Sequence, residues 1–215
     1  MKTVLLIGIG RFGFHMAQKF HGLHHEVLAI DTDEERVNAV LPYVTNAQIA
    51  DCTNEKFIKS LGVRNFDLCV VAVGGDFQSS LEITALLKDN GAKFVVSRAA
   101  NDFHAKFLLR NGADEVVYPE KQVANWAAVC YSSENILDYV QLTPDYSIYE
   151  VKVPPSWLGK TPLDLAVRQK YNINVLATKS NNTLDTMTGP DHVFTDTETM
   201  LIMGHNKDLQ RFLHL

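Results

Sequence analysis

The stretch Thr3–Gly13, TVLLIGIGRFG, decides the fold of this chain. It begins with an apolar run typical of a strand that is buried on both faces, and three glycines follow in the spacing Gly-x-Gly-x-x-Gly. In that motif Gly8 permits a tight turn, Gly10 lets the backbone approach a phosphate, and Gly13 lets the next helix pack closely on the strand. The free N–H groups at the start of this helix attract an anion. The stretch therefore predicts a nucleotide site of the Rossmann type.

An acidic residue at the end of the second apolar run supports this interpretation. That run is Glu26–Asp31, and Asp31 lies 18 positions after Gly13. In dinucleotide-binding units an acid about 20 residues after the glycines binds the ribose hydroxyls. A carboxylate at this position repels a 2′-phosphate, so NADP is disfavoured. Without the strand, the helix and the acid, the glycines would indicate no more than a turn.

Strand-like runs and helical patterns alternate through the first two thirds of the chain. The predicted strands are Thr3–Gly8, Glu26–Asp31, Ala47–Asp51, Leu68–Val73, Lys93–Arg98 and Glu115–Val117. The helical patterns between and after them are Arg11–His21, Thr32–Leu41, Asn54–Leu61, Ser79–Asn90, Asn101–Asn111 and Gln122–Tyr131. Such alternation predicts an α/β fold with a Rossmann-like, doubly wound parallel sheet.

Ligands of this fold bind at the carboxyl ends of the strands, and that rule selects the candidate site. The predicted cofactor-binding residues are Gly8, Gly10, Arg11, Phe12, Gly13, Asp31, Thr32, Asp51, Cys52, Val73, Gly74 and Arg98. A guanidinium group is suited to phosphate oxygens, so Arg11 would favour a polyphosphate. Four structural alternatives stay open: a solvated Arg11, a turn or capping role for Asp51, a helix cap at Asp76, and a local salt bridge at Arg98.

The composition is that of a globular protein. The 215 residues are 46% hydrophobic and 21% charged, which excludes disorder as the main state. A net charge of −5 without a Lys/Arg block argues against nucleic-acid binding. The apolar runs are far shorter than the roughly 18 residues of a membrane span, and no signal peptide is recognisable. Three widely separated cysteines (Cys52, Cys69 and Cys130) favour a reducing compartment, so we expect a cytoplasmic protein.

The remaining third of the chain predicts a small α+β unit. The polar segment Ser132–Asn135 marks a hinge, which divides the chain into residues 1–134 and 135–215. The predicted strands of the second unit are Tyr146–Val153, Asn172–Lys179 and Thr199–Gly204, with a polar loop at Ser180–Asp196 and a closing helix at Asn206–Leu213. Thr161 followed by Pro162 predicts the start of a further helix.

Neither unit carries a recognisable catalytic arrangement. There is no Tyr-x-x-x-Lys, no nucleophile elbow and no Walker sequence, and the second unit is small for a substrate domain. The sequence therefore predicts a nucleotide sensor rather than an enzyme. A nicotinamide-dependent oxidoreductase and an NADH-sensing module remain the alternatives.

Several segments resemble the regulator-of-potassium-conductance family (RCK/KTN), in particular its TrkA/KtrA-type cytosolic subunits. The segments are Gly8–Gly13, His25–Asp31, Ala50–Thr53, Leu61–Asp67, Val71–Gly74 and Asn111–Glu120, then Gly159–Leu163 and Tyr171–Ala177 in the second unit. The resemblance covers essentially the whole chain. It implies an RCK N-terminal domain that includes a crossover helix, and an RCK C-terminal domain of the TrkA-C type.

The resemblance also implies a function. Such subunits form dimers and then an octameric ring that docks on a membrane potassium-translocating subunit, and ATP or ADP in the Rossmann sites (alternatively NAD or NADH) gates transport. It places Arg11 at the triphosphate, Asp31 at the ribose and Asp51 near the adenine. It assigns to Glu120 a cation such as Mg²⁺, Ca²⁺ or Na⁺, which suits a carboxylate. It assigns a cyclic di-AMP site to the second unit, at Leu163, Arg168, Ile173 and Asn174.

Overall fold

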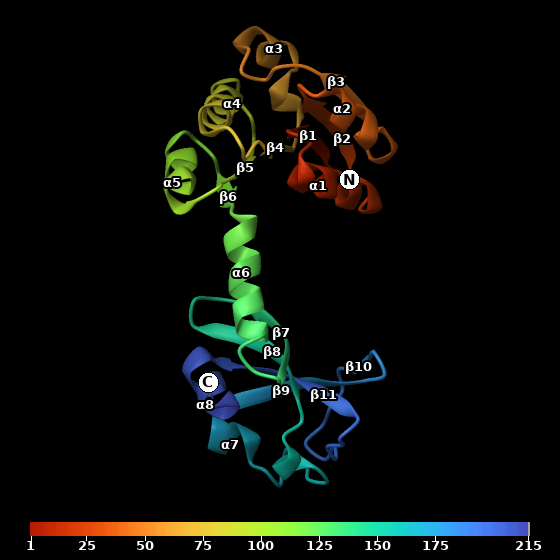
Figure 1. Ribbon diagram of the computed structural model, residues 1–215. Coiled ribbons are helices and arrows are strands. Elements are labelled where there is room, and N and C mark those ends of the chain that lie inside the picture. Colours follow the sequence, from red (N-terminus) through yellow and green to blue (C-terminus); the bar gives the residue numbers. More distant parts are fainter. Residues whose placement is uncertain (215) are drawn as a thin grey trace. The chain divides into compact units, whose positions relative to one another are not determined.

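The computed structural model describes residues 1–214, which form two compact units (Figure 1). The first unit is Met1–Glu120 and the second begins at Lys121. Helix α6 (Pro119–Cys130) starts where the first unit ends, and most of it is grouped with the second. The expected domain boundary at residues 134 and 135 therefore stays a prediction.

The first unit is built on a parallel six-stranded sheet in the order β3-β2-β1-β4-β5-β6. The strands are β1 (Thr3–Ile7), β2 (Glu26–Asp31), β3 (Asn46–Ile49), β4 (Leu68–Val71), β5 (Val95–Arg98) and β6 (Glu115–Val117). All six predicted strands are present, some with shorter ends. Successive residues Val4, Leu5 and Leu6 of β1 are fully buried, because helices cover both faces of a parallel sheet. The strand order reverses between β1 and β4, which is where ligands bind in such sheets.

Five helices connect these strands: α1 (Arg11–Gly22), α2 (Glu34–Val40), α3 (Glu55–Ser60), α4 (Phe77–Asp89) and α5 (Asp102–Arg110). Four of these helices begin at a polar N-cap residue. Asp33, Asn54, Asp76 and Asn101 each accept a hydrogen bond from a backbone N–H in the first turn. Asn90 and Asn111 cap the ends of α4 and α5, where Asn-Gly predicted the stops.

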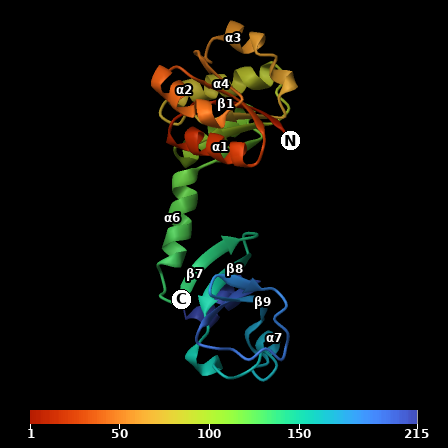
Figure 2. The ribbon, with the colours of Figure 1, turned by 90° about the vertical axis from the view of Figure 1, so that its right-hand side faces the viewer.

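The second unit contains a five-stranded antiparallel sheet in the order β10-β9-β11-β8-β7. Its elements after α6 are β7 (Ile136–Gln141), β8 (Tyr146–Lys152), α7 (Val167–Tyr171), β9 (Ile173–Ser180), β10 (Thr183–Asp185), β11 (Glu198–His205) and α8 (Asn206–Leu213). Helix α7 packs beside β9 (Figure 2). A separate core fills this unit around Trp157, Phe194 and Met200. The predicted α/β fold with a small α+β unit is confirmed.

Three local predictions for the second unit were wrong. Helix α7 begins at Val167 rather than after Thr161, because Thr161 and Asp164 bond to each other in an isolated turn and Ala166 takes a left-handed backbone with φ +47. Strand β7 follows the expected hinge directly, where no strand was predicted. Strand β10 lies inside the predicted polar loop. Both are edge strands with mostly exposed side chains, so they lack the apolar alternation that marks a strand.

Candidate functional site

A cavity of about 810 Å³ lies at the carboxyl ends of the strands of the first unit. Ten predicted cofactor-binding residues line it: Gly8, Gly10, Arg11, Asp31, Thr32, Asp51, Cys52, Val73, Gly74 and Arg98. Phe12, Gly13 and Glu120 are not among its lining residues. Thr32 directly follows β2, and Val73 follows the end of β4. The order of the strands thus brings together residues that are far apart in the sequence.

The three glycines of the motif differ in what surrounds them. Gly8 has a φ of +93, and a Cβ there would lie 2.9 Å from the backbone nitrogen of Val73. A Cβ on Gly13 would come well under 3.0 Å from the carbonyl oxygen of Gly8, so only glycine lets α1 pack this closely on the end of β1. At Gly10, no described atom lies within 4 Å of a Cβ position. The backbone of Gly10 therefore faces open space in the cavity, as a phosphate-binding loop requires.

Asp31 ties the glycine loop to the second strand. Its Oδ2 accepts a hydrogen bond of 2.6 Å from the backbone N–H of Ile9, and its Oδ1 accepts one of 3.0 Å from Asp33. The side chain is 7% exposed, and the Arg36 guanidinium lies 3.7 Å from Oδ2. A carboxylate has about four acceptor positions, so these bonds leave capacity for ribose hydroxyls. The contacts fix the carboxylate beside the glycine loop.

Arg98, the last residue of β5, is held from two sides. Its Nη2 donates to Oε1 of Glu120, and its guanidinium lies 5.8 Å from the centre of the Phe12 ring. Phe12 thus touches a cavity residue although it does not line the cavity. The Nε of Arg98 is buried and finds no hydrogen-bond partner among residues 1–214. An unpaired buried donor is costly, which makes this N–H available to an anion.

Glu120 lies in the first turn of α6 and is exposed. Its own backbone N–H and, to a lesser extent, the guanidinium groups of Arg98 and Arg11 hold the pKa of its carboxyl below the ordinary value, against the opposing effect of burial. The predicted metal ligand is therefore ionised and already paired with Arg98. Among residues 1–214, no group of three or more His, Cys, Asp or Glu side chains is placed to hold a metal ion. The structure does not test the predicted cation.

Two predicted site residues at the cavity wall have local partners. Asp51 Oδ1 accepts from the N–H and the hydroxyl of Thr53 at 2.9 and 2.8 Å, which holds the pKa of Asp51 below its ordinary value. Burial, with the charges of Asp51 and Asp31, raises the pKa of the Cys52 thiol to about 12. Cys52 is therefore an apolar part of the wall and not a nucleophile.

Asp76 is the N-cap residue of α4, so the helix cap that was left open as an alternative for this residue is present.

The sequence reasoning missed several lining residues, of which Arg36 is the most polar. It lies in the first turn of α2, 3.7 Å from the carboxylate of Asp31 and 3.3 Å from that of Asp33. Its position five residues after the end of β2, in the first turn of the next helix, could have identified it. The other unpredicted lining residues are Ile7, Ile9, Phe14, His15, Ile30, Ala39, Ala50, Thr53, Ala72, Ser79 and Ile83.

Of the four residues predicted for a second site, two line one cavity. Leu163 and Arg168 border a space of about 480 Å³ in the second unit, together with Thr188 and Pro190. Ile173 is fully buried in the core of the unit, and Asn174 is half-buried on β9. Neither Ile173 nor Asn174 lines this cavity.

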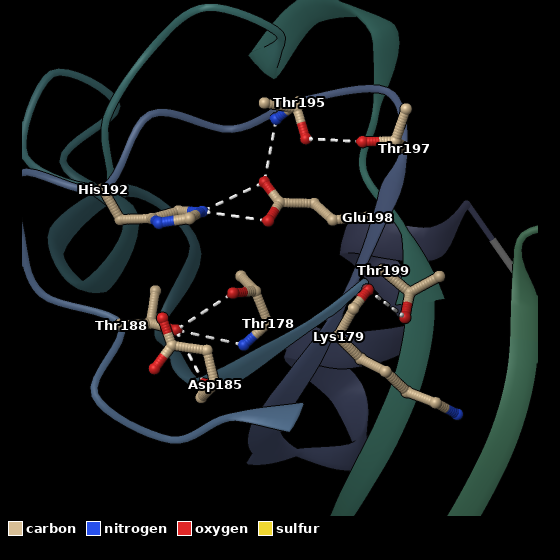
Figure 3. Close-up of polar contacts among 9 residues, drawn as sticks. All are labelled: Thr178, Lys179, Asp185, Thr188, His192, Thr195, Thr197, Glu198 and Thr199. Carbon is tan, nitrogen blue, oxygen red and sulfur yellow. Dashed lines mark hydrogen bonds and ion pairs between the residues drawn. The ribbon is translucent and has the colours of Figure 1, made fainter. Parts of the chain in front are cut away.

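The loop between β10 and β11 forms one wall of this smaller cavity and is held at two points (Figure 3). His192 Nε2 lies 3.0 and 3.1 Å from the two carboxylate oxygens of Glu198, which also accepts from the N–H of Thr195 at 2.8 Å. The N–H of Thr178 donates to the hydroxyl oxygen of Thr188 at 3.0 Å. Because Thr188 lines the cavity, these bonds fix the position of its wall.

A known family matches the unit that carries the larger cavity. The TrkA-N domain family matches residues 4–119. The chain belongs to the TrkA-N family. Ktr system potassium uptake protein A of Bacillus subtilis (strain 168) is 39% identical to this TrkA-N protein over 211 residues, 98% of this chain and 95% of the relative. Ktr system potassium uptake protein C of the same organism is 36% identical over 98% of this chain and 96% of the relative.

Solved structures show the same fold. The GsuK RCK domain matches the whole TrkA-N protein with a TM-score of 0.67 at 15% identity. The GsuK channel bound to NAD matches 99% of it with a TM-score of 0.68 at 14% identity. The chain spans 47% and 39% of the length of those two solved chains. The resemblance to TrkA/KtrA-type subunits of the RCK family is therefore confirmed, and the two Bacillus subtilis relatives are named potassium uptake proteins. No helix within residues 1–214 has the length and apolar character needed to cross a membrane.

Proposed function

We propose that this protein is a cytoplasmic, nucleotide-sensing regulatory subunit of a Ktr-type potassium transporter. It would bind a membrane potassium-translocating subunit and control ion flow through that partner. Two curated relatives of nearly equal length, both named potassium uptake proteins, support this role. In this proposal the protein catalyses no reaction and changes shape with the nucleotide that it holds.

The proposal rests on the residues that surround one cavity of about 810 Å³. They are Gly10 with its open backbone, the anchored Asp31, and the guanidinium groups of Arg11 and Arg98. That volume is within the roughly 300–1,000 Å³ of small-ligand sites. The two cations and the helix start suit phosphates, and Asp31 suits the ribose hydroxyls. The unpaired Nε of Arg98 gives a direct reason to expect an anion.

We assign ATP and ADP to this cavity. Arg11 would bind the terminal phosphates, Asp31 the ribose, and Asp51 would lie near the adenine amino group. Cys52, Thr32, Val73 and Gly74 would shape the walls, while Phe12 and Gly13 would act by supporting Arg98 and the glycine loop. Glu120 would hold a Mg²⁺, Ca²⁺ or Na⁺ ion, which would supply positive charge for the phosphates, since these hard cations take oxygen ligands.

Gating would follow from the contacts that ATP makes and ADP does not. A ligand shifts a conformational equilibrium only by its difference in affinity for the two states. The terminal phosphate of ATP, near Arg11, Arg98 and the cation at Glu120, supplies such a difference. We propose that the protein forms a homodimer, that these dimers assemble into an octameric ring, and that the conformational shift changes the shape of this ring.

Cyclic di-AMP would bind the second unit, with Leu163 and Arg168 in contact and Ile173 and Asn174 supporting the site.

A thermal-unfolding panel with ATP, ADP, AMP, NAD⁺, NADH and cyclic di-AMP tests the ligand assignment. A ligand that binds the folded state raises the melting temperature by mass action. We expect a clear rise with ATP and with ADP, and a smaller one with NAD⁺ and NADH. Stabilisation by NADH alone would overturn the assignment and favour a redox-sensing module. Turnover of NADH with a substrate would favour an oxidoreductase.

A potassium-uptake assay tests the transport role. The gene, expressed with a Ktr-type membrane subunit in cells that lack potassium uptake, should restore growth at low potassium. A variant with Gly10→Asp, which fills the phosphate position with a carboxylate, should not restore growth. Equal growth with and without the protein would overturn the regulatory role.

A further inference from the structure

A second-unit cavity of about 660 Å³, separate from both sites described above, combines aromatic rings with a cationic rim. It lies between the segment that follows β8, the end of α7 and the end of α8. Three aromatic residues, Trp157, Tyr171 and Phe212, line it. We propose that this cavity binds a small organic anion with a flat apolar body, such as an aromatic carboxylate.

The three rings form one connected cluster. Trp157 lies 5.4 Å from Tyr171 and 5.2 Å from Phe212, and Tyr171 lies 5.5 Å from Phe212, as measured between ring centres. These distances are those of favourable aromatic pairs. Trp157 is only 2% exposed, so its ring is fixed, while Tyr171 and Phe212 are partly open to solvent. The cluster offers a rigid apolar surface against which a flat ring can pack.

The rim of the same cavity is positive, although the whole chain carries a net charge of −5. Lys152, Lys170 and Arg211 line it, against one acid, Asp208. Arg211 is 3.5 Å from Asp208, and the ammonium of Lys170 lies 5.3 Å from the centre of the Tyr171 ring. No ion pair is found for Lys152 or Lys170 among residues 1–214. Two positive charges therefore stand beside the apolar surface without a carboxylate partner.

The local helix ends do not cancel this charge. Lys170 and Arg211 lie in the last turns of α7 and α8, where the carbonyl groups carry about half a negative charge per helix. Three full positive charges exceed those two partial charges and the Asp208 carboxylate. The positive rim would therefore stabilise the charged group of a bound anion, and the aromatic rings would stabilise its apolar part. The cavity volume is also within the roughly 300–1,000 Å³ of small-ligand sites.

Isothermal titration calorimetry of the full chain with 2-naphthoate tests the proposal. We expect saturable binding of one molecule per chain. The neutral isostere 2-naphthamide should bind at least tenfold more weakly. With the nucleotide cavity saturated by ADP, inorganic phosphate, which has no ring, should give no saturable heat. Saturating ADP should leave naphthoate binding unchanged, which separates this site from the nucleotide cavity and from the fate of that assignment.

Charge-removing variants locate the site, and because Lys152 and Lys170 are exposed we expect these variants to fold. Lys152→Gln combined with Lys170→Gln should weaken naphthoate binding at least tenfold. Lys207→Gln, on the exposed side of α8 and outside the cavity, is the matched control and should bind like the wild type. Equal binding of the acid and the amide, absence of binding, or an unaffected double variant would overturn the proposal.

Discussion

At the residue scale, two glycines of one motif have different tasks. Gly13 is a packing residue, because a side chain there meets the carbonyl oxygen of Gly8. Gly10 faces the cavity, and no described atom blocks a Cβ at that position. The same substitution should therefore lower the stability at Gly13 and the ATP affinity at Gly10.

Gly13→Ala should lower the free energy of unfolding by about 3 kcal/mol, since overpacking against fixed backbone costs roughly 1–3 kcal/mol or more. Gly10→Ala should unfold at nearly the wild-type denaturant concentration but lose most of its ATP affinity. Urea titrations and calorimetry measure the two quantities. Gly22→Ala, where a Cβ also meets open space but outside the cavity, is the control for both. A Gly10→Ala protein that binds ATP normally would contradict this division of tasks.

Arg11 lines the cavity at the first residue of α1, and the proposed function places it at the terminal phosphates. Arg11→Ala should weaken ATP binding about tenfold or more and ADP binding less than threefold, because charge-assisted contacts to the terminal phosphate exist only with ATP. Calorimetric titrations with both nucleotides provide the comparison. Lys19→Ala removes a cation from the same helix outside the cavity and should change neither affinity. Equal losses for ATP and ADP would count against a triphosphate contact.

At the element scale, a buried polar network joins α4, α5 and β5, close to the larger cavity of the first unit. His104 Nε2 lies 2.6 Å from the Ser80 hydroxyl, and its Nδ1 accepts from the N–H of Ala100 at 3.2 Å. Thr84 connects Ser80 to Ser97, the residue before Arg98. His104 is 1% exposed, and burial lowers the pKa of its imidazole from the ordinary value of 6.5. The folded protein thus favours the neutral ring.

This network predicts a pH-dependent stability. The folded-state pKa of His104 is lower than the unfolded one, so its contribution is complete above about pH 6.5 and is lost as the pH falls through the folded-state pKa. Urea unfolding should show a smaller stability difference between wild type and His104→Gln at pH 5.5 than at pH 7.5. His24→Gln, an exposed position with no part in the network, should show no such change. A difference independent of pH would contradict a neutral, buried His104.

Sequence patterns predict a helix or strand most reliably when hydrogen bonds between residues close in sequence stabilise it. Asn54 and Asn101 cap their helices through bonds to N–H groups two or three residues further on, and both helices were predicted. The turn at Thr161 shows the limit of this reasoning. Its local bonds resemble a helix start, but the left-handed backbone at Ala166 ends the turn before a helix forms. Edge strands β7 and β10 depend on their neighbours in the sheet, so their own patterns are weak.

At the scale of the whole molecule, each unit has its own core. Residues of β1, β2 and β4 fill the first, and Trp157, Phe194 and Met200 are in the second. The chain contains two tryptophans, Trp126 and Trp157, and both belong to the second unit. Their fluorescence therefore reports on one unit alone.

ATP should act mainly on the unit that binds it. We expect ATP to move the unfolding transition seen by circular dichroism to higher urea, and to move the tryptophan fluorescence transition less, because a ligand stabilises the structure that holds its site. AMP, which lacks the outer phosphates, is the control ligand and should shift both transitions only slightly. Identical shifts of both transitions with ATP would show that the two units unfold as one.

The sequence by itself determined the Rossmann-like sheet, its glycine loop and the acid at the end of β2. These features arise from short-range patterns: apolar strands, a turn that only glycine fits, and helix caps that act within one turn. The tertiary structure alone decided how Arg98, Phe12 and Glu120 come together, and which residues line each cavity. Arg98 and Glu120 are 22 residues apart, and their contact depends on the packing of β5, β6 and α6. The spacing of these residues along the chain does not predict their contacts, because the contacts form only when separate elements fold against one another.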